Sequence, residues 1–350
     1  MQNYDAFLLV SFGGPEGPED VWPFLRRVTR GRNVPEERLA EVAGHYQAVG
    51  GRSPINDSCR HLLGRLEAPL AALGLPCYWG NRNWHPLLED TLATMRSDGV
   101  QRALAFVTSA YGGYSSCRQY LDDITAAQAK VGPGAPAVDK LRLFYNHPGW
   151  VGPWATSAAR AHRAALSALS RRPPGPDGEE GQGGGESEVE VVFTAHSIPG
   201  AAARTSPYVA HVTETARLVA GQAGFERWQL AWQSRSGSPG TPWLGPDICE
   251  VVESSPAPAV TVVPVGFVCE NLEVTHDLDV EAAAAAARRG MVFQRAEGVS
   301  ASDSFTEMVV GLVRERLEPT APRPALGADG PWPESCPAGH CPPPYRIPVG

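Results

Sequence analysis

The sequence predicts an α/β fold of two doubly wound, Rossmann-like domains, each built on a parallel sheet. Short apolar, β-branched runs alternate with amphipathic helical segments along most of the chain. Polar and aromatic loops follow successive strands, and the carboxyl ends of parallel strands share one edge of a sheet. With 350 residues, 43% of them hydrophobic, the chain is long enough for two cores. We therefore expect a ligand site in a cleft between the strand ends of the two domains.

The composition restricts the classes of partner. A formal charge of −8 and a pI near 5.6 argue against nucleic acid, whose binding needs a basic face. The first apolar run lacks a preceding basic segment and is too short for a signal peptide, and no run approaches the ~20 apolar residues that span a bilayer. Seven cysteines, an odd number, do not indicate a disulfide framework in a chain of this size. We expect a cytoplasmic protein without a transmembrane segment.

The first domain is expected to span residues 1–118. Its first strand, 6–11, runs into a turn with two glycines at 12–15, where the backbone can approach a ligand closely. A cluster of four arginines, typical either of a solvated helix end or of a clamp for carboxylates, follows at Arg26, Arg27, Arg30 and Arg32. The remaining elements are expected to be helices over 37–49, 59–73 and 86–97 and strands over 77–80 and 102–107, before the polar, aromatic loop 108–120.

The second domain is expected to span residues 119–302, with the same alternation. Its strands are predicted at 140–145, 189–196, 228–233, 260–267 and 291–296, and its helices at 121–130, 154–169, 205–223 and 278–289. Residues 171–188 are too rich in Pro and Gly to pack and are expected to form a flexible surface insert. A helix over 303–318 is expected to pack back on the first domain, and the Pro-rich tail 319–350 to run extended over the surface.

A histidine ends one of the predicted strands. His196 either closes strand 189–196 as an ordinary hydrogen-bonded side chain or faces the cleft as a functional group. Strand 260–267 is followed by a row of acids that either complement a helix dipole or face His196, namely Glu270, Glu273, Asp277 and Asp279. An imidazole beside a carboxylate makes a divalent-metal site or a proton-transfer pair. The zinc spacings HExxH and paired CxxC are absent, which disfavours a tight zinc site.

Eight motifs, spread in order over the chain to about residue 318, together resemble one known family. They are SFGGP (11–15), TRGR (29–32), HYxxxGGxSPIN (45–56), GNRNW (80–84), TAHSIP (194–199), WQSRSG (232–237), PWLGPD (242–247) and PVGFVCENLE (264–273). The family is the ferrochelatases. The resemblance implies a chelatase-like, two-domain enzyme that inserts Fe²⁺ into a porphyrin held in the cleft. The forms GGxSPIN, GNRNW and SSCRQY resemble the bacterial branch that converts coproporphyrin III to coproheme.

The resemblance also implies roles for single residues. His196 matches the family's active-site histidine and Glu273 the glutamate that faces it, with Asp277 and Asp279 relaying protons or metal outward. Insertion removes two pyrrole protons and delivers a divalent ion, which favours a base that is neutral near pH 7 beside an anion. Whether His196 first meets a proton or iron stays open. The substrate contacts and cleft walls are expected at Phe12, Arg30, His45, Ser53, Tyr114, Ser115, Trp232 and Gln233.

Phe12 departs from the family pattern, because related enzymes carry a tyrosine at this position. A phenyl ring can stack on a macrocycle but cannot ligate iron. Arg30, His45 and Ser53 fall in the family's region for the substrate propionates, where some relatives carry an arginine in place of His45. The four propionates of coproporphyrin need several such donors.

The tail carries a second resemblance, because some ferrochelatases bind a [2Fe–2S] cluster with C-terminal cysteines and one cysteine from the body. Cys336 and Cys341 form a C-x₄-C pair, and Cys117 matches the body ligand. Four ligands are wanted, and His340 is the candidate for the fourth. The alternatives are two free tail cysteines or a disulfide.

Three other functions stay open at this point. The first is insertion into protoporphyrin IX, and the second is a non-catalytic carrier of metal or tetrapyrrole. The third, cobalt insertion into a corrinoid precursor, is disfavoured because such chelatases usually present histidine pairs, and only His276 lies near Glu273 in the sequence. The expected partners are the porphyrin and Fe²⁺, with transient contact to other enzymes of heme synthesis.

Overall fold

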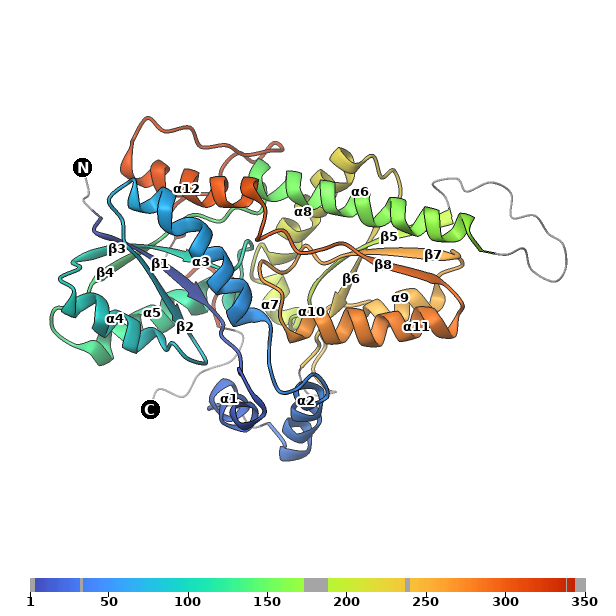
Figure 1. Cartoon of the computed structure of the whole chain (residues 1–350), viewed down its shortest axis with the longest axis horizontal. Coiled ribbons are helices and arrows are strands. Elements are labelled where there is room, and N and C mark those ends of the chain that lie inside the picture. Colours follow the sequence, from blue (N-terminus) through green and yellow to red (C-terminus); the bar gives the residue numbers. More distant parts are fainter. Residues whose placement is uncertain (1–3, 32–33, 173–187, 237–239, 338, 344–350) are drawn as a thin grey trace, which may run out of the picture.

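The computed structural model describes residues 4–31, 34–172, 188–236, 240–337 and 339–343. Arg32 of the arginine cluster and nearly all of the expected insert 171–188 lie outside these residues. Figure 1 shows two sheets side by side, with the helices α1 and α2 below them. Across the described residues, no helix is both long and apolar enough to span a bilayer.

The first sheet has four parallel strands in the order β2-β1-β3-β4. The inner strand β1 (Ala6–Ser11) is buried along its whole length. Its alternate side chains join two apolar clusters, one with α3 (Ile55–Ala71) and the other with α4 (Leu88–Ser97) and α5 (Gln119–Val131). The other strands are β2 (Cys77–Asn81), β3 (Arg102–Val107) and β4 (Ala137–Lys140).

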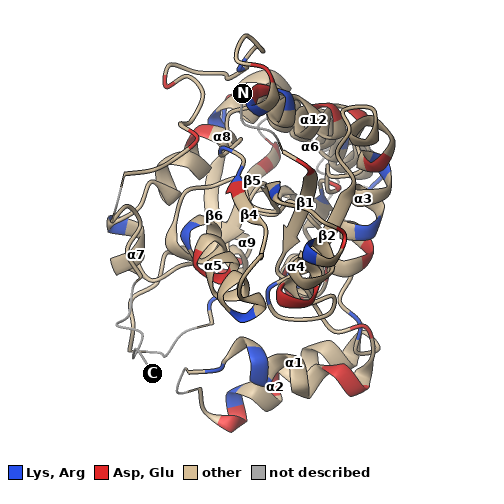
Figure 2. Ribbon diagram, turned by 90° about the vertical axis from the view of Figure 1, so that its left-hand side faces the viewer, with Lys and Arg blue, Asp and Glu red and all other residues tan. Residues whose placement is uncertain are grey.

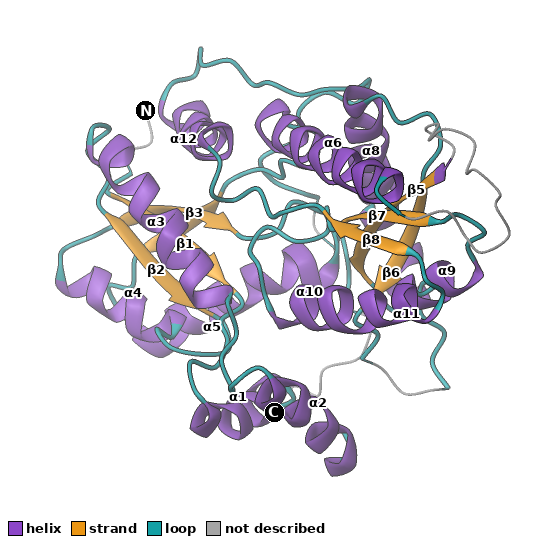
Figure 3. Cartoon of the chain, turned by 45° about the vertical axis from the view of Figure 1, so that its right-hand side comes forward, coloured by secondary structure: helices purple, strands orange, loops and turns teal. Residues whose placement is uncertain are grey.

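The second sheet repeats this arrangement in the order β6-β5-β7-β8, again with parallel strands. Its strands are β5 (Val189–His196), β6 (Gln229–Gln233), β7 (Ala259–Val263) and β8 (Val292–Arg295). One face is covered by α6 (Pro148–Ser170) and α8 (Tyr208–Ala223), the other by α9 (Ile248–Ser254), α11 (Ala283–Arg288) and the π-helical turn Asp277–Ala282. Figure 3 shows these helices on both sides of the sheets. The predicted α/β fold with two parallel sheets is confirmed.

The change from one sheet to the other comes later in the chain than expected. β4 pairs with β3, with Ala137 opposite Arg102, so α5 and β4 belong to the first sheet although they follow residue 119. The strand expected over 140–145 is wrong, because the chain leaves the sheet after Lys140. Phe144 is buried where the chain crosses between the sheets, stacked 5.1 Å from the Phe106 ring of β3. An apolar run is buried whether it forms a strand or a segment that crosses between sheets, so the sequence pattern did not distinguish these two structures.

The helix α12 (Asp303–Leu317) joins the two halves of the molecule. It lies against α3 and against α6, as Figure 1 shows. Glu315 of α12 forms a buried ion pair with Arg142 in the crossing segment, with 2.7 Å between Oε2 and Nε. A buried pair of this kind holds only when both partners remain, because either charge alone would be desolvated without compensation.

The described part of the tail after α12 contains no helix or strand, but it is anchored. Nδ2 of Asn146 donates hydrogen bonds to the carbonyls of Leu326 and Gly330, at 3.1 and 2.8 Å. The Trp332 ring lies edge-on to His211, with 4.5 Å between the ring centroids. These contacts hold the tail against the body as far as Cys341, which is buried.

The helices α1 (Val21–Val28) and α2 (Glu36–Ala48) form a pair outside the sheets, and Figure 2 shows basic residues on both and acidic residues on α2. Phe24 of α1 packs edge-on against Tyr46 of α2, with 5.8 Å between their centroids. His45 of α2 stacks on His276 of the second domain. The pair therefore contributes to the site from the first domain.

Candidate active site

A histidine and a carboxylate meet at the carboxyl ends of the second sheet. His196 is the last residue of β5, and Glu273 lies in the first turn of α10 (Leu272–His276), which follows β7. Nε2 of His196 lies 3.3 Å from Oε1 of Glu273, and the side chains are 30% and 48% exposed. Nδ1 of His196 donates a hydrogen bond to the carbonyl of Ser197. Nε2 is therefore the nitrogen that can accept a proton or bind a metal.

The backbone around this pair is held by several short contacts. Asn271 caps α10 by accepting the N–H of Val274 at 3.0 Å, and Gln233 Nε2 donates to the carbonyl of Glu273 at 2.8 Å. A Cβ at Gly266 would lie 2.4 Å from Cα of Ala195. Only glycine lets the loop before α10 pass this close to the strand that carries the histidine.

The protonation state of His196 differs from the expectation. Burial alone would lower the pKa of His196, but the charge and hydrogen bond of Glu273, with smaller contributions from the Ser197 carbonyl and Asp277, raise it to about 9. The imidazole is therefore protonated at pH 7, and the expectation of a neutral base is wrong for the free protein. A metal ion must displace this proton before it can bind Nε2.

Asp277 lies next to the pair, and its pKa is also raised, which favours its neutral form. Burial, together with the negative charges of Glu273 and Glu281, raises its pKa to about 6, although a hydrogen bond from the Ser234 hydroxyl opposes this change. A carboxyl group with this pKa exchanges protons near neutral pH. It begins a π-helical turn, a feature that often marks functional sites.

The predicted row of four acids divides into two pairs. Glu273 and Asp277 are the acids whose charges act on His196. Glu270 and Asp279 instead bind Arg295 of β8, at 2.9 and 2.6 Å. Arg295 holds these two carboxylates away from the histidine, so the structure does not bring Asp279 into the expected relay.

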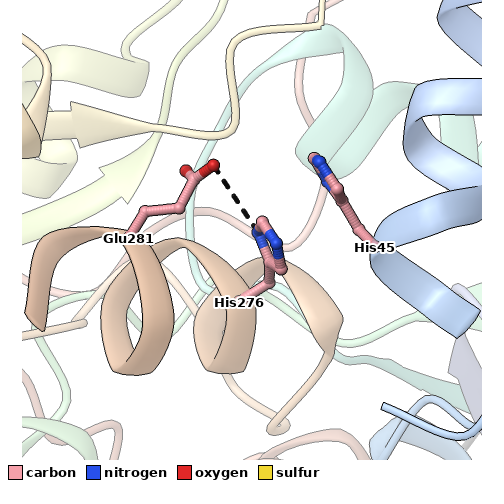
Figure 4. A group of neighbouring side chains, drawn as sticks. All are labelled: His45, His276 and Glu281. Atoms are coloured by element: carbon pink, nitrogen blue, oxygen red, sulfur yellow. Dashed lines mark ion pairs between the residues drawn. The ribbon is translucent and has the colours of Figure 1, made fainter. Parts of the chain in front are cut away.

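A second polar cluster, the outer metal group, joins the two domains beside the first. It consists of His45, His276 and Glu281, each of which offers one ligand atom within 4.8 Å of the others. Figure 4 shows the two imidazoles face to face, with 3.9 Å between their centroids, and Glu281 pointing to His276. His276 is 9% exposed, and its Nδ1 accepts or donates no hydrogen bond among the described residues. Two imidazoles and a carboxylate are suitable ligands for a divalent transition metal.

Sequence reasoning missed Glu281 as a member of this cluster and assigned His45 to the substrate propionates. His276 and Glu281 are five residues apart, so they would not share a face of an α-helix. They come together because residues 277–282 form a π-helical turn, in which the hydrogen bonds run from i to i+5. Burial and the charge of His276 lower the pKa of His45, which favours the neutral, metal-binding form of its ring.

The first domain presents aromatic side chains. Four of them, the aromatic group, are linked by edge-on contacts around Phe24, whose centroid lies 6.3 Å from Phe12, 5.8 Å from Tyr46 and 6.1 Å from Trp84. Burial and the charge of Glu273 raise the pKa of Tyr46, so this ring lies within electrostatic reach of the carboxylate. Through Tyr46, the charge of Glu273 acts on the aromatic group.

The other expected substrate contacts lie in different environments. Arg30 and Ser115 are exposed, and Tyr114 is half-buried. Ser53 is 3% exposed and donates its backbone N–H to the Pro15 carbonyl. Trp232 and Gln233 are also buried, so they pack beneath the site and are not exposed to a ligand.

The cysteines of the expected cluster come from two parts of the chain, with Cys336 exposed and Cys117 and Cys341 buried. Cys341 is buried, and its Sγ lies 3.0 Å from Nδ1 of the neighbouring His340. Burial, together with charges on Cys117 and Cys336, raises the pKa of Cys341 to about 11. Cys117 lies in a second π-helical turn, Tyr114–Arg118.

Comparison with known proteins identifies the family. The ferrochelatase family model matches residues 4–317. The chain belongs to the ferrochelatase family. A ferrochelatase of Rhodopirellula baltica is 44% identical over 97% of this chain and 93% of its own length. Two coproporphyrin III ferrochelatases, from Nocardia farcinica and Frankia alni, are 47% and 46% identical over 93% and 98% of this chain and 91% and 88% of their own lengths.

Solved chelatase structures share the fold of this ferrochelatase-family chain. SirB from Bacillus subtilis with Fe³⁺ aligns with a TM-score of 0.51 at 10% identity, over 91% of this chain and 99% of SirB. The sirohydrochlorin chelatase SirB from Bacillus subtilis subspecies spizizenii in complex with cobalt gives 0.50 at 10% identity, over 91% and 97% of the two chains. At this identity the likeness concerns the fold alone.

Proposed function

We propose that the protein inserts Fe²⁺ into coproporphyrin III, forms coproheme and releases two pyrrole protons. The proposal depends above all on the His196–Glu273 pair, whose Nε2 and Oε1 atoms are 3.3 Å apart and open to a ligand. The identity of 46–47% to two coproporphyrin III ferrochelatases supports the choice of porphyrin. Protoporphyrin IX is the alternative substrate, and a metal or tetrapyrrole carrier is the alternative without turnover.

The proton steps follow from the charges of the site. His196 starts protonated, so its first proton leaves through Glu273 and Asp277 before Nε2 meets the metal or a pyrrole N–H. Two N–H bonds of the porphyrin then break, Fe²⁺ binds all four pyrrole nitrogens of the resulting dianion, and the two protons pass to the same groups. Asp277, with a pKa of about 6, returns them to water near neutral pH.

The outer metal group supplies the metal in this proposal. His45, His276 and Glu281 hold Fe²⁺ outside the site, and Asp277 lies between this group and the His196–Glu273 pair, with its Oδ1 3.6 Å from Nδ1 of His276. A shared acid lets the ion move inward without passing through an uncompensated environment.

The aromatic group holds the porphyrin against this side. Phe12 offers its ring for stacking, whereas it has no atom that ligates iron. Arg30 is exposed and is the proposed propionate contact, with Ser53 in the same expected region, whereas Tyr114 and Ser115 are proposed as walls of the cleft.

A direct assay tests the proposal. The purified chain is given Fe²⁺ under anaerobic conditions with either porphyrin, and loss of free-porphyrin fluorescence is followed. We expect faster turnover of coproporphyrin III, and equal or faster turnover of protoporphyrin IX would reverse the assignment. A carrier would bind the porphyrin without forming the metal complex.

We also propose that Cys117, Cys336 and Cys341 hold a [2Fe–2S] cluster, with His340 as the fourth ligand. The proposal is supported by the chemistry of the candidate ligands, thiols and an imidazole, and by the 3.0 Å between Sγ of Cys341 and Nδ1 of His340. The cluster would supply a one-electron redox centre. These residues would also join the tail to the start of α5.

The absorption spectrum of iron-replete protein tests this second proposal. We expect visible charge-transfer bands that Cys341→Ser removes and that the matched control Cys77→Ser, in β2, retains. A colourless protein with full iron supply would contradict the cluster. A cytoplasmic location and transient contact with other enzymes of heme synthesis stay predictions.

A further inference from the structure

An arginine that the proposed reaction does not use lies beneath Phe12. The guanidinium carbon of Arg82 is 5.6 Å from the Phe12 ring centroid and 4.4 Å from that of Tyr120. Its side chain is 5% exposed and forms an ion pair with Asp123 of α5. Arg82 therefore connects α5 to the Phe12 ring, which faces the porphyrin in our proposal.

The backbone around Arg82 holds the same loop. The N–H of Arg82 donates to the carbonyl of Ser11, and the N–H of Asn83 donates to the carbonyl of Phe12, both at 3.0 Å. Nδ2 of Asn83 donates a second bond to the Phe12 carbonyl at 3.2 Å. The segment after β2 thus fixes both sides of the peptide that carries the phenyl ring.

Gly13, which follows Phe12, restricts the backbone conformation of this loop. Gly13 has a φ of +79°, a conformation that favours glycine, and a Cβ there would lie 2.8 Å from Cβ of Asn81. With the backbone fixed, the remaining freedom of Phe12 is the rotation of its side chain. The Phe12 and Phe24 rings lie edge-on to one another, and Arg82 lies over one face of Phe12.

A buried guanidinium is a suitable group for this position. A cation over an aromatic face is attracted by the ring quadrupole, and the attraction grows when water is excluded. The planar group can contact both rings while its nitrogens bind the carboxylate of Asp123. Asp123 compensates the charge, so the arginine can stay buried.

We propose that Arg82 is a positioning residue that sets the orientation of the Phe12 ring for stacking on the porphyrin. The inference rests on the proposed function, because Phe12 acts on the porphyrin only there. It assigns Arg82 no contact with iron or with the reacting nitrogens. Its loss should weaken porphyrin binding and leave iron delivery unchanged.

A double-mutant cycle between Arg82 and Phe12 tests this role. Arg82→Met removes the charge but keeps an unbranched side chain, and we expect the KM for the porphyrin to rise about fivefold. The KM for Fe²⁺ and kcat should stay within about twofold. In the Phe12→Leu background, Arg82→Met should cause no further rise, because the ring that it orients is gone. The Kd of metal-free coproporphyrin III, measured by fluorescence, gives the same comparison without turnover.

Two further variants keep the test decisive. Arg65→Met removes an arginine that pairs with Asp303 away from these rings, and it should leave the porphyrin KM unchanged. If circular dichroism shows that Arg82→Met does not fold, Arg82→Lys is taken through the same cycle. Independent, multiplying effects of the Arg82 and Phe12 substitutions would overturn the inference. An unchanged KM in Phe12→Leu alone would instead refute the proposed porphyrin contact of Phe12.

Discussion

The two domains supply opposite kinds of surface to one site. The second domain contributes titratable groups, namely His196, Glu273 and Asp277. Their contacts raise the pKa of His196 to about 9, which holds its proton, and bring the pKa of Asp277 to about 6, where it exchanges protons near neutral pH. The first domain contributes the aromatic group, whose rings hold one another by edge-on contacts. His45 is the exception, because it reaches from α2 to join the second domain's His276.

In our proposal the second domain therefore carries out proton and metal transfer, and the first domain binds the planar porphyrin. Proton and metal transfer need groups that change charge, whereas stacking needs a rigid apolar face. Because Phe12 has no donor atom, our proposal has the metal approach from the side of His196. The comparison predicts that substitutions on the second-domain side change rate and metal dependence, and that those on the aromatic side change porphyrin affinity.

The largest effect is expected at His196. His196→Ala should lower kcat by about 10²–10⁴-fold, because the proton acceptor and proposed metal ligand is removed. The Kd for metal-free coproporphyrin III should change little, since the aromatic group is intact. A loss of porphyrin affinity equal to the loss of rate would remove the division between the two sides.

Glu273→Gln should change the titration of His196. In the free protein the imidazole should titrate with a pKa near 9, so it loses its proton as pH rises toward that value. Without the carboxylate charge, burial dominates and the pKa should fall toward or below its ordinary 6.5. The activity at low Fe²⁺ should accordingly rise with pH between 6.5 and 9 in the native protein only. NMR titration of the imidazole, assigned with His196→Ala, measures both values, and identical pKa values would contradict the pairing.

The sequence predicted the arrangement that depends on strand order. Apolar periodicity indicated two parallel sheets, and the shared edge of parallel strands made it possible for the acids after β7 to face His196. The resemblance to the ferrochelatases then singled out Glu273 among these acids. The sequence did not predict which acids bind Arg295, because the arginine comes from β8, 16 and 25 residues from its partners. The prediction that His196 is neutral near pH 7 was also wrong. Its pKa depends on the distance to Glu273, which the spacing of the two residues in the sequence does not reveal.

The outer metal group should affect metal supply more than chemistry. His276→Ala removes the buried imidazole, and we expect the KM for Fe²⁺ to rise several-fold, about three- to tenfold, with kcat retained. Glu281→Gln should act in the same direction because it removes a ligand charge. Isothermal titration with Co²⁺, a less oxidisable probe, should show one site fewer in His276→Ala. Unchanged metal binding in both variants would show that the outer metal group does not bind the metal before insertion.

The smallest effect is expected at Asp279, which serves as the matched control for Asp277. Asp277→Asn removes a group that titrates near pH 6 beside His196, so it should slow turnover and shift the pH dependence. Asp279→Asn removes only a partly exposed partner of Arg295, which keeps its second partner Glu270. An exposed ion pair contributes about 0–1 kcal/mol to the free energy of unfolding, so Tm should fall slightly while kcat and both KM values stay within about twofold. If Asp279→Asn slowed turnover as much as Asp277→Asn, the whole row of acids would act as one relay, and the division made by Arg295 would have no functional meaning.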